Sequence, residues 1–94
     1  MEKTRTRYRR VYVEVVALFR HNGSMDPKML IWPNGKQYTI DRLLAMHPSR
    51  YQDSDRRCDF YKVEICGKER MLFFEHNNDT ESAFTGCWFV KARA

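Results

Sequence analysis

The residues best suited to chemistry stand at the start of the chain. They are the four arginines Arg5, Arg7, Arg9 and Arg10. In an extended chain the first three would project from one side about 6–7 Å apart, a spacing comparable to that of successive phosphates on a single nucleic acid strand. A guanidinium group donates two hydrogen bonds to a phosphate at once. These arginines therefore predict a weak, salt-sensitive contact with nucleic acid; the alternative is a solvated tail that adds solubility.

The net charge of +5 is concentrated on this segment. Residues 1–10 hold five basic side chains and one acidic side chain, whereas residues 11–94 hold 12 basic and 11 acidic ones. The rest of the chain is therefore nearly neutral. A length of 94 residues fits a single domain. We expect residues 1–10 to form a flexible basic arm and residues 11–94 to form the domain.

Aromatic side chains predict a second kind of contact, because small barrels bind single strands by stacking bases on exposed rings. Four rings fall on the strand parity opposite the expected core: Tyr12, Phe60, Phe74 and Phe89. Four others are assigned to the core: Trp32, Tyr38, Phe73 and Trp88. The alternative for the first group is packing over the ends of the barrel, where a small domain needs large side chains.

A ten-residue polar stretch, residues 77–86, is longer than a tight hairpin connection. Long loops on rigid scaffolds often carry binding function. Phe84 is a large apolar group within it, suited either to anchor a protein partner or to plug the open end of a barrel. Together with Tyr12 and Phe60, it forms the predicted partner contact.

Cysteine and histidine side chains are potential zinc ligands. They are Cys58, Cys66, Cys87, His21, His47 and His76. None of them forms the short Cys–Cys or His–His spacing that structural zinc sites use. Folding would have to bring the three cysteines and His76 together, so the sequence predicts no metal site and no cofactor.

Catalysis would need a nucleophile or base oriented by a partner. The titratable groups nearest the expected strand ends are Asp41, His47, Glu75 and His76. No Gly-rich phosphate loop, nucleophile elbow or metalloprotease motif accompanies them. Asp41-Arg42 and Glu75 are more simply explained as cross-strand ion-pair partners on an exposed sheet face. We therefore expect a protein that is not an enzyme.

The cysteine count and the apolar runs bear on location. Three cysteines are an odd number, whereas small secreted domains usually carry even sets. We expect free thiols and a reducing, cytoplasmic environment. The longest apolar run, residues 11–19, contains Glu14 and is far shorter than the roughly 20 residues of a membrane span. No membrane contact and no secretory signal are expected.

The elements that position these groups are β-strands. Residues 11–19 alternate β-branched or aromatic side chains with polar ones, which is typical of a half-buried strand. Residues 28–32 and a strand starting at Gln37 flank the dipeptide Asn34-Gly35. We predict a hairpin there with a type I′ turn.

A second hairpin is predicted from residues 60–65 and 70–75 around a turn at Cys66-Gly67-Lys68, and residues 87–90 are predicted to form a closing strand. Residues 40–46 are compatible with a helical turn or, as we favour, with a bent strand. These elements indicate an all-β fold: a small, strongly bent antiparallel barrel of five to six strands, SH3-like or OB-like, with at most one short helical turn.

Four segments carry a resemblance to a known family. Residues 32–42, 60–67, 72–75 and 88–90 resemble those of a family of short bacterial proteins that has no established activity. The likeness covers most of residues 11–90 and implies one compact β-domain. It implies no functional residues, and the arginine-rich arm departs from the family.

The leading functional hypothesis is a non-enzymatic binding or adaptor module, whose open sheet edge accepts a strand from a protein partner. The alternative is a weak nucleic-acid-binding domain that uses the arm and exposed aromatic rings. Val16 and Leu18 interrupt the polar parity of residues 11–19. If uncovered, they form an apolar patch of the kind that predicts a homodimer.

Overall fold

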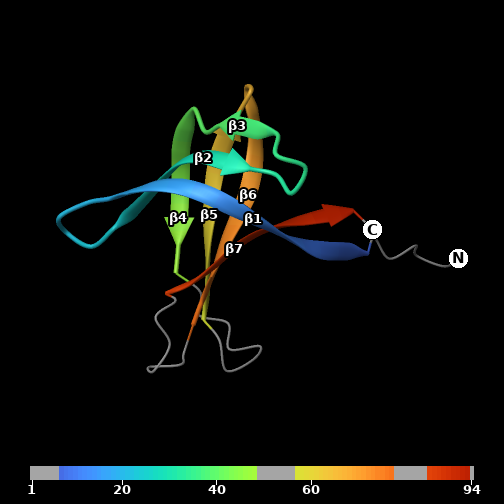
Figure 1. Cartoon of the computed structure of the whole chain (residues 1–94). Helices are drawn as coiled ribbons and strands as arrows, with labels where there is room; N and C mark the ends of the chain where they lie inside the picture. Colours follow the sequence, from blue (N-terminus) through green and yellow to red (C-terminus); the bar gives the residue numbers. More distant parts are fainter. Residues whose placement is uncertain (1–6, 49–56, 78–84, 94) are drawn as a thin grey trace, which may run out of the picture.

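Seven β-strands make up the part of the chain that the computed structural model describes, residues 7–48, 57–77 and 85–93. The strands are β1 (Tyr8–Phe19), β2 (Met25–Ile31), β3 (Gln37–Thr39), β4 (Arg42–His47), β5 (Cys58–Ile65), β6 (Lys68–His76) and β7 (Gly86–Arg93). They form one antiparallel sheet in the order β3-β2-β1-β7-β6-β5-β4 (Figure 1). No helix occurs in these residues. The predicted all-β antiparallel fold is confirmed, with seven strands instead of five or six.

The sheet curls into a half-barrel because β1 has different neighbours along its length. Residues 8–13 pair with β7, and residues 14–19 pair with β2. A register shift between Val16 and Ala17 adds to the bend. The last strand thus pairs with the first, and the half-barrel stays open between the edge strands β3 and β4.

The first strand begins before the expected boundary between arm and domain, which fell after residue 10. Tyr8 opens β1, and Arg9 and Arg10 lie opposite Ala92 and Lys91 of β7. Residues 8–10 therefore belong to the sheet and not to a flexible arm. They pair with the end of β7 because its backbone donors and acceptors need partners. Residues 1–6 lie outside the described part of the chain.

The hairpin between β2 and β3 lies where the sequence predicts it, but its turn is not type I′. Gly35 has a φ of 88°, and Asn34 has no positive φ, whereas a type I′ turn needs both. The N–H of Trp32 donates to the carbonyl of Lys36, and the Gly35 N–H donates to the carbonyl of Trp32, each at 2.8 Å. This pattern is a type I turn followed by a glycine bulge. The Asn34 side chain stabilises it by accepting from the Lys36 N–H.

Two other tight turns, between β1 and β2 and between β5 and β6, lie within the described residues. The β1–β2 turn repeats the construction just described, with Asn22 and Gly23 in the equivalent places. The two-residue type I′ geometry joins β5 to β6, where Cys66 and Gly67 have φ values of 52° and 75°. The Cys66 N–H donates to Asp41 Oδ2 at 3.0 Å. This bond helps to hold a non-glycine residue in the left-handed region, which such residues rarely adopt.

Residues 42–46 belong to β4 and no helical turn forms between residues 40 and 46, so the favoured strand is confirmed for most of this stretch. Ile40 and Asp41 link β3 to β4, and their N–H groups donate to the carbonyls of Lys28 and Glu64. The chain thereby passes from one edge of the sheet to the other in two residues. β4 then pairs with β5, with one register shift along the way.

The core lies on the concave face of the half-barrel. Its buried apolar side chains are Leu30, Ile40, Tyr61, Val63, Leu72 and Phe74. Tyr38 and Trp88 pack against this cluster, as predicted. Phe73, predicted in the core, lies on the convex face, and Phe74, predicted outside, is buried. Adjacent residues of a strand face opposite sides, and two consecutive phenylalanines do not indicate which one points inward.

Candidate functional site

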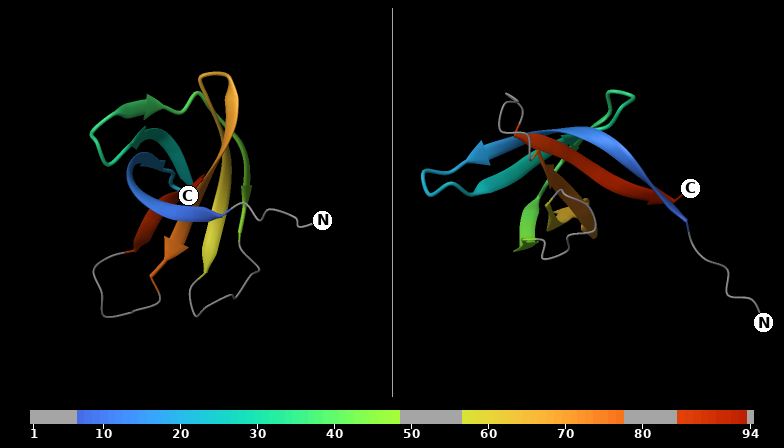
Figure 2. Two further views of the ribbon diagram at one scale, coloured as in Figure 1. Left: turned by 90° about the vertical axis from the view of Figure 1, so that its right-hand side faces the viewer. Right: turned by 90° about the horizontal axis from the view of Figure 1, so that it is seen from below.

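The ends of β1 and β7 form a two-stranded ribbon that projects from the half-barrel, dark blue and red in Figure 1. Residues 8–11 pair with residues 90–93, and within the described chain neither segment has a strand on its other side. Figure 2 shows the two segments running together away from the remaining strands. We call residues 7–12 and 89–93 the basic ribbon. It contains no carboxylate and five cations: Arg7, Arg9, Arg10, Lys91 and Arg93.

One face of the basic ribbon alternates rings with cations. The opposed pairs on this face are Tyr8 with Arg93, Arg10 with Lys91, and Tyr12 with Phe89. Successive pairs are about 6–7 Å apart along the strands. Tyr8 and Tyr12 are 62% and 50% exposed. Cations for phosphates and ring faces for bases are the two components of single-strand binding surfaces.

Arg10 attaches the basic ribbon to the sheet. Its Nη1 lies 2.5 Å from Glu75 Oε2, and its guanidinium carbon lies 4.5 Å from the centre of the Phe89 ring. Hydrogen bonds to Tyr12 and Glu75 raise the pKa of the Arg10 guanidinium. Phe89 is only 1% exposed, because Arg10 and Tyr12 contact its outer side. Arg10 is therefore already engaged within the protein.

The other arginines of the predicted arm differ from Arg10. Arg7 and Arg9 are exposed, and no carboxylate of the described residues forms an ion pair with either. Arg5 lies outside the described residues. The open cations of the basic ribbon are thus Arg93, on the face that carries Tyr8 and Tyr12, and Arg7 and Arg9, which strand alternation places on the opposite face.

A row of rings crosses the convex face from β1 to β4. Its members, each opposite the next in the strand register, are Tyr12, Phe89, Phe73, Phe60 and His47. The four successive centroid distances are 5.7, 5.1, 6.4 and 4.7 Å. Lys91 Nζ lies 4.9 Å from the centre of the Phe73 ring. This outer aromatic row gives the sheet apolar contacts on its convex face, opposite the core.

The structure brings together two of the predicted partner-contact residues. Tyr12 and Phe60 belong to the same outer aromatic row, separated by Phe89 and Phe73. Phe84 lies outside the described residues. Phe60 is half-buried, so Tyr12 is the more accessible of the two.

A cleft of about 820 Å³ lies beside the basic ribbon. It opens because the first part of β6 and the last part of β7 share no backbone pairing. Its walls come from the basic ribbon and from the β2–β3 and β5–β6 hairpins. The rings of Tyr8, Trp32 and Tyr38 line it, and core side chains such as Leu30 and Val63 form its floor.

The charges around the cleft are mostly positive. Lys68, Arg70 and Lys91 line it, and one lining residue, Glu69, is acidic. The Glu69 carboxylate lies 3.5 Å from Lys62 Nζ, which offsets its charge. The cleft thus combines an apolar floor, aromatic walls and a cationic rim.

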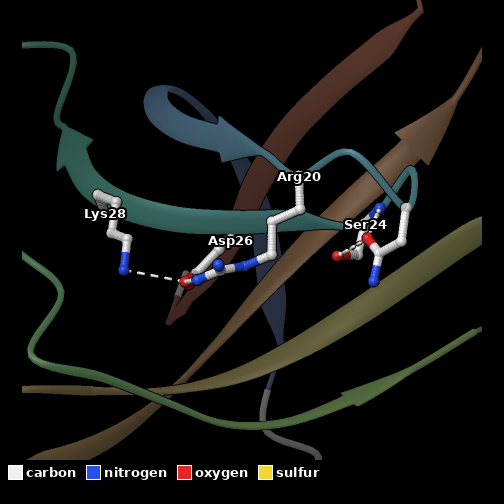
Figure 3. Close-up of polar contacts among 5 residues, drawn as sticks. Arg20, Ser24, Asp26 and Lys28 are labelled. Atoms are coloured by element: carbon white, nitrogen blue, oxygen red, sulfur yellow. Dashed lines mark hydrogen bonds and ion pairs between the residues drawn. The ribbon is translucent and has the colours of Figure 1, made fainter.

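A second groove, about 710 Å³ in volume, lies between the start of β2 and β4, where the half-barrel is open. Asp26 is the centre of its polar side, with Lys28 Nζ and Arg20 Nη2 each 2.9 Å from Oδ2 (Figure 3). These hydrogen bonds, that of Lys28 first, lower the pKa of Asp26. Both cations are paired with the Asp26 carboxylate, which reduces the positive charge that they present in this groove.

The candidate metal ligands do not gather. Cys66 is exposed in the β5–β6 turn, while Cys58 and Cys87 lie opposite Glu75 on either side of β6. Burial raises the pKa of the Cys58 thiol. His76 Nε2 lies 2.6 Å from Asp59 Oδ2. Within residues 7–48, 57–77 and 85–93, no three such side chains form a group that could hold a metal ion.

Sequence reasoning missed the half of the site that β7 contributes. Lys91 and Arg93 alternate directly after the predicted closing strand, a signal that this strand continues and carries cations on one face. Tyr8 was assigned to the arm and Trp32 to the core, whereas both line the cleft. Only strand pairing reveals that these residues lie together.

Comparison with protein-family models, curated proteins and solved structures finds nothing that matches this chain. The resemblance to short bacterial proteins stays a prediction, as does the cytoplasmic location. Among the described residues, no helix of the length and apolar character needed to cross a bilayer is present.

Proposed function

We propose that this chain is a nucleic-acid-binding domain, an OB-like half-barrel whose contact surface is the basic ribbon. The observation that carries the proposal is the ribbon's composition: five cations and no carboxylate on two paired strands, with exposed tyrosines between them. Phosphate contacts supply most of the affinity in sequence-independent binding. Exposed rings add stacking with bases.

The size of the surface sets the expected strength. Arg10 is engaged by Glu75, and Lys91 lies over Phe73, which leaves Arg7, Arg9 and Arg93 as the open cations. For about three phosphate contacts on a single strand, the slope of log Kobs against log salt should be about −2. Binding of this kind is weak at physiological salt and fast to form.

The test is fluorescence anisotropy with a labelled, mixed-sequence single strand over a series of salt concentrations. The double variant Arg9→Ala/Arg93→Ala should weaken binding roughly 10- to 100-fold at low salt and flatten the slope by about 1.4. Arg57→Ala is the matched control, because Arg57 is exposed but lies outside the basic ribbon. Binding by the wild type that does not depend on salt, or equal losses in both variants, would contradict the proposal.

A protein partner that adds a strand is the second candidate function. The observation that favours it is β4, an edge strand that pairs only with β5 among the described residues. Leu43, Leu44 and Met46 are partly exposed on it, and such edges accept strands from other chains. Strand addition at β4 does not involve the ribbon cations, so Arg9→Ala/Arg93→Ala should leave it intact. The same variant therefore separates the two functions.

A further inference from the structure

We infer that the cleft beside the basic ribbon receives an unpaired nucleobase, so that the ligand is single-stranded nucleic acid and not a duplex. This inference rests on the proposed function and names the ligand class of that same surface. Its basis is the composition of the cleft and its position relative to the ribbon.

The size and the apolar floor of the cleft suit a small, flat ligand. A volume of about 820 Å³ is within the range of roughly 300–1,000 Å³ for small-molecule sites, which are mostly apolar with a few polar groups. The floor contains Leu30, Ile40 and Val63, which belong to the apolar core or pack with it. Flat, weakly hydrated ring systems fit such a floor, whereas phosphates do not.

Four aromatic residues line the cleft: Tyr8, Trp32, Tyr38 and Phe73. Tyr8 comes from the basic ribbon, and Trp32 and Tyr38 come from the β2–β3 hairpin. Lys36 Nζ lies 5.5 Å from the centre of the Tyr38 ring. Base stacking on aromatic side chains tolerates any sequence because every base has a π-face.

The cleft is continuous with the proposed phosphate contacts of the basic ribbon. Tyr8 and Lys91 belong both to the basic ribbon and to the cleft. Lys68 and Arg70 add cations on the opposite wall-forming hairpin, β5–β6. A strand whose backbone follows the ribbon therefore brings the adjacent base to the cleft mouth. A base within a duplex is stacked on both sides and cannot enter.

The experiment compares three labelled probes of equal length: a mixed-sequence single strand, an abasic strand with the same phosphates, and the duplex. Wild-type protein should bind the single strand about tenfold more tightly than the abasic strand or the duplex, about 1.4 kcal/mol. The salt slope should be the same for both single strands, because their phosphates are identical.

Three variants test whether the base preference arises at the cleft. Tyr8→Ala should remove the preference for the base-bearing strand and leave abasic binding unchanged, whereas Phe19→Ala, which removes an exposed ring at the other end of β1, should change neither. The base-bearing strand should also quench tryptophan fluorescence, and Trp32→Phe should abolish that quenching while Trp88 remains. Circular dichroism checks that each variant keeps its strands.

The outcomes separate the two claims. Salt-dependent binding of the abasic strand at wild-type strength, with no base preference and no quenching, would overturn the cleft inference and leave the ribbon function standing. Equal affinity for duplex and single strand would also overturn it. Absence of salt-dependent binding to every probe would overturn the proposed function itself.

Discussion

The two halves of β1 each pair antiparallel with one neighbouring strand, but they expose different side chains. Residues 8–13 pair with β7 and carry arginines beside exposed tyrosines. Residues 14–19 pair with β2 and expose Val16, Leu18 and Phe19, at 53%, 47% and 66%. One strand therefore supplies a cationic surface at one end and an apolar surface at the other.

The difference lies in how each half is held. The basic half is held by Phe89, which is buried beneath Arg10 and Tyr12. The apolar half ends in Phe19, whose ring remains largely in solvent. Arg10 thus lies over an apolar ring, whereas Val16, Leu18 and Phe19 are exposed, as residues of an interaction surface often are.

The largest expected effect comes from removing the anchor of the basic half. Phe89→Ala should reduce the free energy of unfolding by about 3–5 kcal/mol, as for other buried aromatic truncations, and should loosen the ribbon. Phe19→Ala should change it by about 0.5 kcal/mol or less. Urea unfolding of both variants measures this difference. Equal destabilisation by the two substitutions would contradict the difference in how the two halves of β1 are held.

A smaller effect is expected at the apolar half. If Val16, Leu18 and Phe19 mediate self-association, Leu18→Lys should raise the dimer dissociation constant about 10- to 100-fold, which corresponds to the loss of one buried leucine. Sedimentation velocity over a concentration series measures it, with Arg9→Ala as the control from the basic half. A wild type that stays monomeric throughout would count against this role of the patch.

The smallest effect concerns Asp26, which pairs with Arg20 directly after the apolar half and with Lys28. The pKa of Asp26 is lowered in the folded state. Its stabilising contribution is therefore complete above the pKa of Asp in the unfolded chain, about 4, and is lost as the pH falls through the folded-state pKa. Exposed partners limit that contribution to about 1 kcal/mol. Asp26→Asn should remove this part of the acid sensitivity in thermal melts at pH values from neutral to acidic. An unchanged acid profile would show that the pairing contributes nothing.

Local patterns predicted much of the fold. Alternation predicted a strand at residues 11–19, which lie in β1, and turn residues placed the β2–β3 and β5–β6 hairpins. The sequence did not predict the type of each turn correctly. Only Gly35 has a positive φ in the Asn34-Gly35 turn, whereas both Cys66 and Gly67 have one. Phe73 and Phe74 were assigned to the wrong faces because two adjacent rings satisfy either parity.

The candidate site was predicted in part. The arginines before residue 11 indicated a polyanion contact, and Tyr12 indicated an accessible ring. Lys91, Arg93 and Trp32 did not enter that prediction, since they stand at least 20 residues away in sequence. Their proximity arises from the β1–β7 pairing and from the hairpins that surround the cleft.

The sequence by itself determined that the chain forms antiparallel strands with tight turns and that its charge excess lies near the N-terminus, since both follow from local residue types. Only the tertiary structure decided that β7 adds two cations, Lys91 and Arg93, to this charge and forms a ribbon beside a cleft. The reason is that strand pairing joins distant segments through backbone hydrogen bonds, which are available to almost every residue and so leave little trace in sequence.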